Sequence, residues 1–333
     1  LDAYPFTDES KYGSNEKWFN SVRSLNLNHV KSWKKIFSQV NFDNLVDLKF
    51  RMNMDKDFHV EDFDVDDFEL LPSELKKLDC DMYNLIYHDD LRQIRFPVGL
   101  TELSLSILCF KNGDQEQGYD SPDLDLSNLE NLKIFKHSLE TSSIDYPKNL
   151  LELYAGHISI PLGELYSCCP DLVKLECGGF SDITGDFPKK ITDLTIGIRG
   201  FTDLYEYWQN TNRRKHGSKS RKLDDCSPFS WKILSQLHHL TVSDDYGVSD
   251  DYGVLDQFTI FPKESDGYDF SNMKTFKMFS EDDLNIGDIP SSLTSLRVTR
   301  TKDLDFSRFK YFDNLVDVHF SKMNEILKVK CEF

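Results

Sequence analysis

The sequence lacks the features that mark secreted and membrane-spanning proteins. It contains no Asn-x-Ser/Thr acceptor for N-glycosylation, and no apolar run approaches the length needed to cross a bilayer. Its seven cysteines include no Cys-x-x-Cys pair, and the adjacent Cys168 and Cys169 suit a disulfide framework poorly. These absences predict reduced thiols in a soluble intracellular protein, cytoplasmic or nuclear, that does not enter a membrane.

The short motifs of common enzyme classes are also missing. The sequence has no Gly-x-Gly-x-x-Gly, no phosphate-binding loop, no Gly-x-Ser-x-Gly and no His-Glu-x-x-His. The neighbouring His238 and His239 fall in an apparent strand, so their rings should point to opposite faces and cannot share one metal ion. We therefore predict a non-enzymatic protein with neither cofactor nor metal.

The chain has a shortage of positive charge. It carries 39 Lys and Arg against 57 Asp and Glu, for a formal net charge of −18. Because phosphate contacts need a net basic surface, this balance argues against nucleic acid as the main partner. An acidic surface favours a basic protein partner, or serves only to keep the chain soluble.

One segment runs against this acidity, with six basic residues in ten positions. Three interpretations stay open for it: a solvated insertion without a specific role, a nuclear import signal, or a contact with phosphate or nucleic acid. Its basic residues are Arg213, Arg214, Lys215, Lys219, Arg221 and Lys222.

Twelve short segments repeat one pattern, in which an apolar residue is followed by two more at +3 and +5. Five of them carry an apolar-proline pair with the proline three places before the first apolar residue, as in Ile289-Pro290 before Leu293, and five carry Asn or Asp directly before it. Most intervals lie between 19 and 30 residues, which is the period of a solenoid that stacks one short strand per repeat. The first apolar positions are Val22, Leu45, Leu75, Leu100, Leu129, Leu150, Leu172, Ile191, Leu237, Met273, Leu293 and Leu315.

Through Leu100-Thr-Glu-Leu103-Ser-Leu105 and Leu293-Thr-Ser-Leu296-Arg-Val298, the chain resembles the leucine-rich repeat family. The proline form of the repeat is similar to the short FNIP-type repeats of some intracellular eukaryotic proteins. The resemblance implies an α/β fold, an open, curved leucine-rich repeat solenoid. Its mostly parallel sheet would have about 12 short strands, with loops, 3₁₀ turns and short helices on the convex side. We expect a cap over residues 1–20 and a solenoid over 21–333, with insertions at 204–231 and 243–270.

The repeat also predicts which side chains face outward. If the first, fourth and sixth residues of each motif point into the core, the fifth and seventh lie on the open side of the sheet. Exposed aromatic residues beside cationic ones are typical anchors of protein interfaces. An alternative is that each phenylalanine folds over the sheet edge to cover an irregular repeat. If these side chains face outward as interface anchors, the predicted partner contacts are Lys133, Phe135, Tyr154, Lys277, Phe279 and Arg297.

The leading functional hypothesis is therefore an intracellular scaffold that binds a protein partner on its concave sheet. Resemblance to F-box proteins with leucine-rich repeats implies a more specific alternative. In it the chain is the substrate receptor of an SCF-type ubiquitin ligase, with its F-box upstream of residue 1. A third hypothesis, from another functional class, is a nuclear factor that contacts nucleic acid through residues 213–222.

Overall fold

The computed structural model describes fifteen stretches of the chain, and its contacts cluster in two compact units. These are Leu1–Leu172, called unit 1, and Val173–Phe333, called unit 2, and each is described by itself. The described residues are 21–30, 36–38, 42–52, 65–83, 94–108, 123–138, 143–182, 187–197, 200, 235–243, 259–261, 270–279, 285–287, 289–299 and 313–321. The predicted cap, the predicted insertion at 204–231 and the basic residues at 213–222 lie outside them. Of the insertion at 243–270, only 243, 259–261 and 270 are described.

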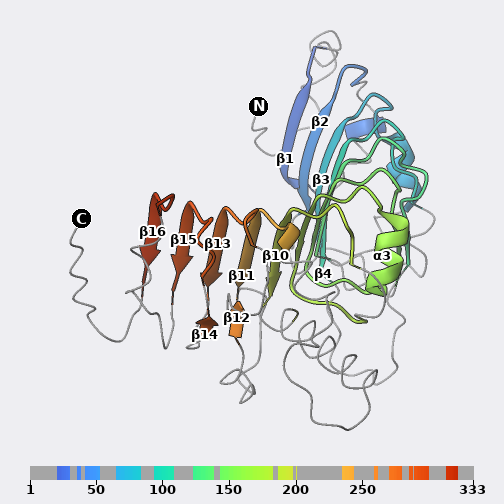
Figure 1. Ribbon diagram of the computed structural model, residues 1–333. Helices are drawn as coiled ribbons and strands as arrows, with labels where there is room; N and C mark the ends of the chain where they lie inside the picture. The colour runs from blue at the N-terminus through green and yellow to red at the C-terminus, as the bar shows by residue number, and fades with distance from the viewer. Residues whose placement is uncertain are drawn as a thin grey trace, which may run out of the picture. The chain divides into compact units, whose positions relative to one another are not determined.

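Each repeat contributes one strand to a parallel sheet, and the strands follow one another in chain order (Figure 1). In unit 1 the strands are β1 (Ser24–Val30), β2 (Asp47–Met52), β3 (Lys77–Tyr83), β4 (Glu102–Leu108), β6 (Ile134–His137) and β8 (Glu152–Ala155). In unit 2 they are β9 (Lys174–Cys177), β10 (Asp193–Gly197), β11 (His239–Ser243), β13 (Thr275–Phe279), β15 (Ser295–Val298) and β16 (Asp317–Phe320). One parallel strand per repeat confirms the predicted leucine-rich repeat solenoid.

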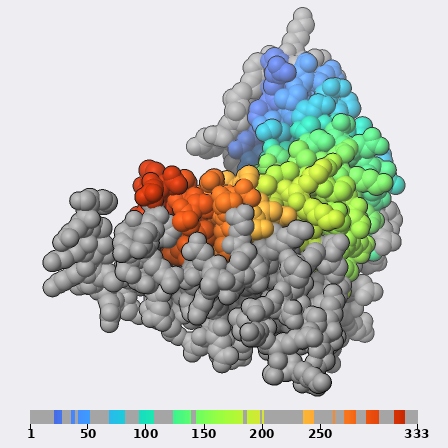
Figure 2. Space-filling view, viewed as in Figure 1, coloured from blue at the N-terminus to red at the C-terminus, as the bar shows by residue number. Residues whose placement is uncertain are grey.

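The described parts of the segments that return from one strand to the next contain short elements of regular structure. In unit 1 they include the 3₁₀ helix η3 (Val65–Leu70), the helix α3 (Leu162–Cys168) and the paired strands β5 (Leu124–Asp125) and β7 (Ile144–Asp145). In unit 2, β12 (Thr259–Phe261) pairs in parallel with β14 (Asn285–Gly287). In the space-filling view the colour changes gradually across unit 1, as expected when each repeat lies beside the next (Figure 2).

The core is a stack of equivalent apolar positions. In unit 1 the fourth residue of each repeat pairs with the fourth residue of the next, as in Leu48 with Leu78 and Leu78 with Leu103. Unit 2 continues the same scheme on its own strands, as in Leu240 with Phe276. The fourth and sixth residues are buried in every strand except β16, where Val318 is 45% exposed. Because each repeat contacts only the repeats next to it, the core of each unit extends along its stack of repeats.

A tight turn sets the register at the start of each strand. The amide of the first residue donates to a carbonyl three residues earlier, as from Leu75 to Pro72 and from Leu100 to Pro97. The next two amides then share one carbonyl of the preceding repeat, as Thr101 and Glu102 share that of Lys76. Proline fits the start of this turn because only its carbonyl is used there and it has no N–H to satisfy.

Side-chain amides support the same turn. Asn131 Nδ2 donates to the Val98 carbonyl at 3.1 Å, and Asn149 Nδ2 donates to the Glu130 carbonyl at 3.0 Å. In unit 2, Asn272 Nδ2 donates to the Ser235 carbonyl at 3.2 Å. In these three repeats the asparagine that precedes the first apolar residue therefore ties the turn to the turn before it.

The predicted frame of the fifth repeat is wrong by three residues. Leu103 pairs with Phe135, so this repeat starts at Leu132 and not at Leu129. Leu129 instead supplies the carbonyl of the turn, accepting from the Leu132 amide at 2.9 Å. Asn precedes a leucine in both frames, but the frame from Leu132 buries the large ring of Phe135 completely. Phe135 is thus a core residue, and its predicted outward orientation is incorrect.

The same shift places a histidine in the core. His137 occupies a sixth position, where the flanking repeats carry Leu105 and Ala155, and it is 7% exposed. Its ring stacks on Phe135 with centroids 4.9 Å apart, and the Tyr146 hydroxyl oxygen lies 3.5 Å from its Nε2. Burial lowers the pKa of His137 from 6.5 to about 4, so the ring is neutral at pH 7.

Two glycines of unit 2 bring backbones unusually close together. A Cβ placed on Gly197 would lie 2.3 Å from the Gly178 carbonyl oxygen. Both glycines occupy seventh positions, where the chain leaves the strand. In unit 1 the equivalent Gly156 has open space, because a Cβ there would meet nothing within 4 Å.

Candidate protein-interaction face

Alternation along each strand sends the third, fifth and seventh residues of a repeat to the side of the sheet opposite the core, here called the open face of each unit. All the third- and fifth-position side chains keep some exposure to solvent. In unit 1 these are Ser24, Asn26, Asp47, Lys49, Lys77, Asp79, Glu102, Ser104, Ile134, Lys136, Glu152 and Tyr154. In unit 2 they are Lys174, Glu176, Asp193, Thr195, His239, Thr241, Thr275, Lys277, Ser295, Arg297, Asp317 and His319.

The open face of unit 1 carries ion pairs that run from strand to strand. Lys49 on β2 pairs with Asp79 on β3, and on the same two strands Arg51 Nε lies 3.6 Å from Asp81 Oδ2. The opposite charges sit directly across from each other because the parallel register aligns equivalent positions. Opposite charges on this part of the face are therefore matched within the protein itself.

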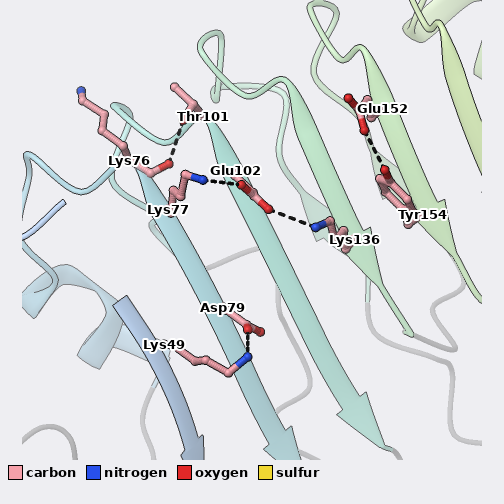
Figure 3. Close-up of polar contacts among 9 residues, drawn as sticks. All are labelled: Lys49, Lys76, Lys77, Asp79, Thr101, Glu102, Lys136, Glu152 and Tyr154. Atoms are coloured by element: carbon pink, nitrogen blue, oxygen red, sulfur yellow. Dashed lines mark hydrogen bonds and ion pairs between the residues drawn. The ribbon is translucent and has the colours of Figure 1, made fainter. Parts of the chain in front are cut away.

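Glu102 on β4 is held between two lysines (Figure 3). Its carboxylate oxygens lie 3.1 Å from Lys77 Nζ on β3 and 3.0 Å from Lys136 Nζ on β6. Partial burial raises the pKa of Glu102, but the hydrogen bonds from Lys136 and Lys77 outweigh it, so the pKa lies below its usual value. The hydrogen bond to Glu102 raises the pKa of Lys77. Glu102 and Lys77 thus both stay charged at neutral pH.

Tyr154 ends this network on β8 (Figure 3). Its hydroxyl donates to Glu152 Oε2 at 2.7 Å, and Lys136 Nζ lies 5.3 Å from the centre of its ring. This distance is within the range of a cation–π contact. An aromatic ring is therefore fixed in one orientation on the open face by a carboxylate and an ammonium group.

The open face of unit 2 carries polar pairs as well, among them His239 Nε2 on β11 at 3.9 Å from Asp193 Oδ1 on β10. On its edge, Arg297 Nε and Nη2 donate to Asp317 Oδ2 at 3.2 and 3.0 Å, and Ser295 Oγ donates to the same oxygen at 3.0 Å. The hydrogen bond from Arg297 lowers the pKa of Asp317, with that from Ser295 next in size. Phe279 is 36% exposed. Lys277 forms no salt bridge with any residue in the described stretches.

Four of the six predicted contact residues lie on an open face, namely Tyr154, Lys277, Phe279 and Arg297. Lys133 does not, because the shifted frame places it next to the turn, where its Nζ donates to the Asn149 carbonyl at 3.3 Å. The position predicted for it belongs to Lys136, which the frame from Leu129 could not identify. The pair Asn131-Leu132 marks the correct frame, but the pair Asn128-Leu129 marks the other frame equally well, so the sequence alone did not separate them.

The described residues contain no group of three or more His, Cys, Asp or Glu side chains placed to hold a metal ion. No helix in the described part of the chain is long and apolar enough to cross a membrane.

No family model matches the chain, and no curated protein matches it in sequence. Among solved structures, the chain is similar to the crystal structure of an internalin from Listeria monocytogenes. The two are 16% identical, with a TM-score of 0.43, over 92% of this chain and 83% of the internalin chain. The fold assignment rests on strand order and register alone.

Proposed function

We propose that this chain is a non-enzymatic intracellular scaffold that binds a protein partner on the open faces of its sheets. The observation that carries the proposal is the division between the two sides of the strands. All the third- and fifth-position side chains of the twelve strands remain accessible, while the residues between them are buried in every strand but β16. Accessible side chains on a rigid ladder can be recognised without any change of the backbone.

The chemistry of the faces supports a protein partner. Parallel strands place equivalent side chains roughly 4.8 Å apart, so each face offers a grid of polar groups with fixed spacing. Two aromatic residues, Tyr154 and Phe279, and two arginines, Arg51 and Arg297, stand on that grid. Aromatic residues and arginine are enriched in protein interfaces and often dominate their energies.

The more specific versions stay predictions. The ligase-receptor version depends on a segment upstream of residue 1, and the nuclear version depends on residues 213–222, outside the described residues. The scaffold proposal holds with or without either of them.

The test is affinity purification of the tagged chain from cells, with bound proteins quantified by mass spectrometry. Three variants are compared with the wild type: Lys136→Ala with Tyr154→Ala on unit 1, Lys277→Gln with Phe279→Ala on unit 2, and Lys148→Gln as the control. Lys148 is exposed in the turn before β8 and lies off the open face.

We expect at least one open-face variant to lose a partner about tenfold, since anchor residues contribute most of the binding energy. The control variant should retain every partner. Partners that survive both open-face variants, or that disappear equally in the control, would show that the open faces are not the binding surface.

A further inference from the structure

Three neighbouring strands of unit 2 carry no carboxylate on their open face. The third, fifth and seventh positions of β11, β13 and β15 are all described, and together they hold five Ser and Thr residues, His239, Lys277, Arg297 and Phe279. We call these nine positions the carboxylate-free patch. The chain as a whole has 57 Asp and Glu and a net charge of −18, so nine neighbouring strand positions without a carboxylate depart from its overall charge balance.

The contrast with unit 1 shows that the patch is a local property. The nine equivalent positions of β2, β3 and β4 include four carboxylates, on Asp47, Asp79, Asp81 and Glu102. Three of these four belong to the ion pairs described above. A partner that docked on that region would have to desolvate formed ion pairs, which costs free energy that the interface must recover.

Lys277 is the cation of the patch that forms no salt bridge with a carboxylate of the described residues. At the fifth positions of the neighbouring strands, Lys277 is paired with Thr241 on β11 and with Arg297 on β15. The open-face carboxylates on either side, Asp193 on β10 and Asp317 on β16, are two strands away, or roughly 10 Å. That separation is about one Debye length in 0.1 M salt, so they screen the Lys277 charge only weakly.

The exposed aromatic ring stands beside this charge on the same strand. Phe279 follows Lys277 by two residues on the same face of β13, so the two side chains leave the sheet roughly 7 Å apart. The residue paired with Phe279 on β11 is Ser243, which adds no charge. An ammonium group and an exposed phenyl ring at this spacing match a carboxylate and an apolar side chain two residues apart on an extended segment.

We propose that the carboxylate-free patch binds an extended protein segment that carries Asp or Glu two residues from a large apolar side chain. The proposal rests on the proposed scaffold function and names the chemistry of its partner. It differs from the basic partner that net charge alone favours, because the charge at the contact surface decides complementarity. Nucleic acid fits less well, since the only other strong cation of the patch, Arg297, is already paired with Asp317 and few phosphates could be neutralised.

The probe is a fluorescein-labelled peptide of about twelve residues with glutamate and phenylalanine two positions apart, titrated with the purified full chain and followed by anisotropy. Three further probes are matched to it: a peptide with lysine for glutamate, a peptide with alanine for phenylalanine, and a single-stranded oligothymidylate. Variants are Lys277→Gln, Lys277→Arg, Phe279→Ala and Phe279→Leu, with Lys148→Gln as the control. Thermal melting by circular dichroism shows that each variant is folded.

We expect the glutamate-phenylalanine peptide to bind at least about tenfold more tightly than its lysine counterpart, and more weakly as salt is added. Lys277→Gln and Phe279→Ala should each weaken it about fivefold or more. Lys277→Arg and Phe279→Leu should keep most of the affinity, and Lys148→Gln should not change it. Equal binding of the lysine peptide, preferential binding of the oligonucleotide, or no effect of the Lys277→Gln and Phe279→Ala variants would each overturn the proposal.

The failure of this inference can be told from the failure of the scaffold function. If cellular partners are lost with the unit 1 variant but retained by the Lys277→Gln and Phe279→Ala variant, the scaffold function stands and the patch is not its site. If partners survive all open-face variants, both proposals fail.

Discussion

Acid should destabilise unit 1 through the buried His137. The pKa of this group is about 4 in the folded chain against 6.5 for the free side chain. Between pH 6.5 and 4 the unfolded chain therefore binds a proton that the folded chain does not, and stability falls as the pH is lowered. At 1.36 kcal/mol per pKa unit, the loss reaches about 2 kcal/mol at pH 5 and about 3 kcal/mol below pH 4. Well above pH 6.5, where His137 is neutral in both the folded and the unfolded chain, its contribution to stability no longer changes with pH.

The cause of this loss is the surroundings of the ring. A protonated His137 would place a charge between the Phe135 ring and the Tyr146 hydroxyl, at a core position that is 7% exposed. Burial removes water from the ring, and desolvation disfavours the charged form of a histidine. The folded chain therefore keeps the ring neutral until the pH is well below that of ordinary histidine titration.

The assay is urea unfolding at pH 7 and pH 5, followed by circular dichroism, for the wild type and for His137→Leu. Leucine is the matched replacement because Leu105 fills the paired position on β4. Carboxylates elsewhere titrate in both proteins and cancel in the comparison. The wild type should lose about 2 kcal/mol more than the variant between the two pH values. Equal losses in the two proteins, within about 0.5 kcal/mol, would refute the reasoning.

Three further predictions concern the backbone and the register. Gly197→Ala should lower the free energy of unfolding by about 2 kcal/mol or more, because its Cβ would meet a carbonyl oxygen at 2.3 Å. Gly156→Ala, at the equivalent position, should change it by less than about 0.5 kcal/mol, and urea titration of the pair checks both. Asn131→Ala should cost about 1 kcal/mol through the lost bond to the preceding turn, measured in the same way. Phe135→Ala should cost about 3 to 5 kcal/mol and Ile134→Ala markedly less, a ranking that would reverse if the repeat began at Leu129.

The spacing of apolar residues was enough to predict the fold. For eleven of the twelve repeats the predicted fourth and sixth residues are those that occupy equivalent positions of the strands, as with Leu48 and Phe50. Prediction succeeded there because a strand with one buried face admits only one register. The solenoid followed from the pattern without knowledge of any side-chain contact.

The fifth repeat shows where this reasoning stops. Two overlapping frames, from Leu129 and from Leu132, both satisfy the apolar pattern at their fourth position, and the correct one places a polar residue, His137, at its sixth. A pattern that counts apolar residues prefers Ile134 to His137. The structure prefers the frame that buries the Phe135 ring and satisfies the turn, and both depend on the neighbouring repeats.

From the sequence, the candidate site could be predicted only as the set of outward-facing positions of the repeats, without the contacts between them. The fifth positions were known apart from that of the shifted repeat, but the ion pairs of Glu102 with Lys77 and Lys136 arise between strands whose spacing in the sequence is irregular. Once the register is known, the pair with Lys77 follows directly because the two residues occupy equivalent positions, and Lys136 is a diagonal neighbour of Glu102 on the next strand. The absence of carboxylates around Lys277 is likewise visible only when three strands are aligned.

The carbonyl that accepts hydrogen bonds from two amides of the next repeat affects which insertions and exchanges the chain can accommodate. Its hydrogen bonds involve only the start of a strand and the start of the preceding one, so they do not depend on the length of chain between them. Ile191 and Leu237 begin neighbouring repeats of unit 2 although 46 residues separate them, and β10 and β11 still pair without a shift. Return segments can therefore be lengthened, exchanged or grafted as independent parts, while the open face keeps its pattern.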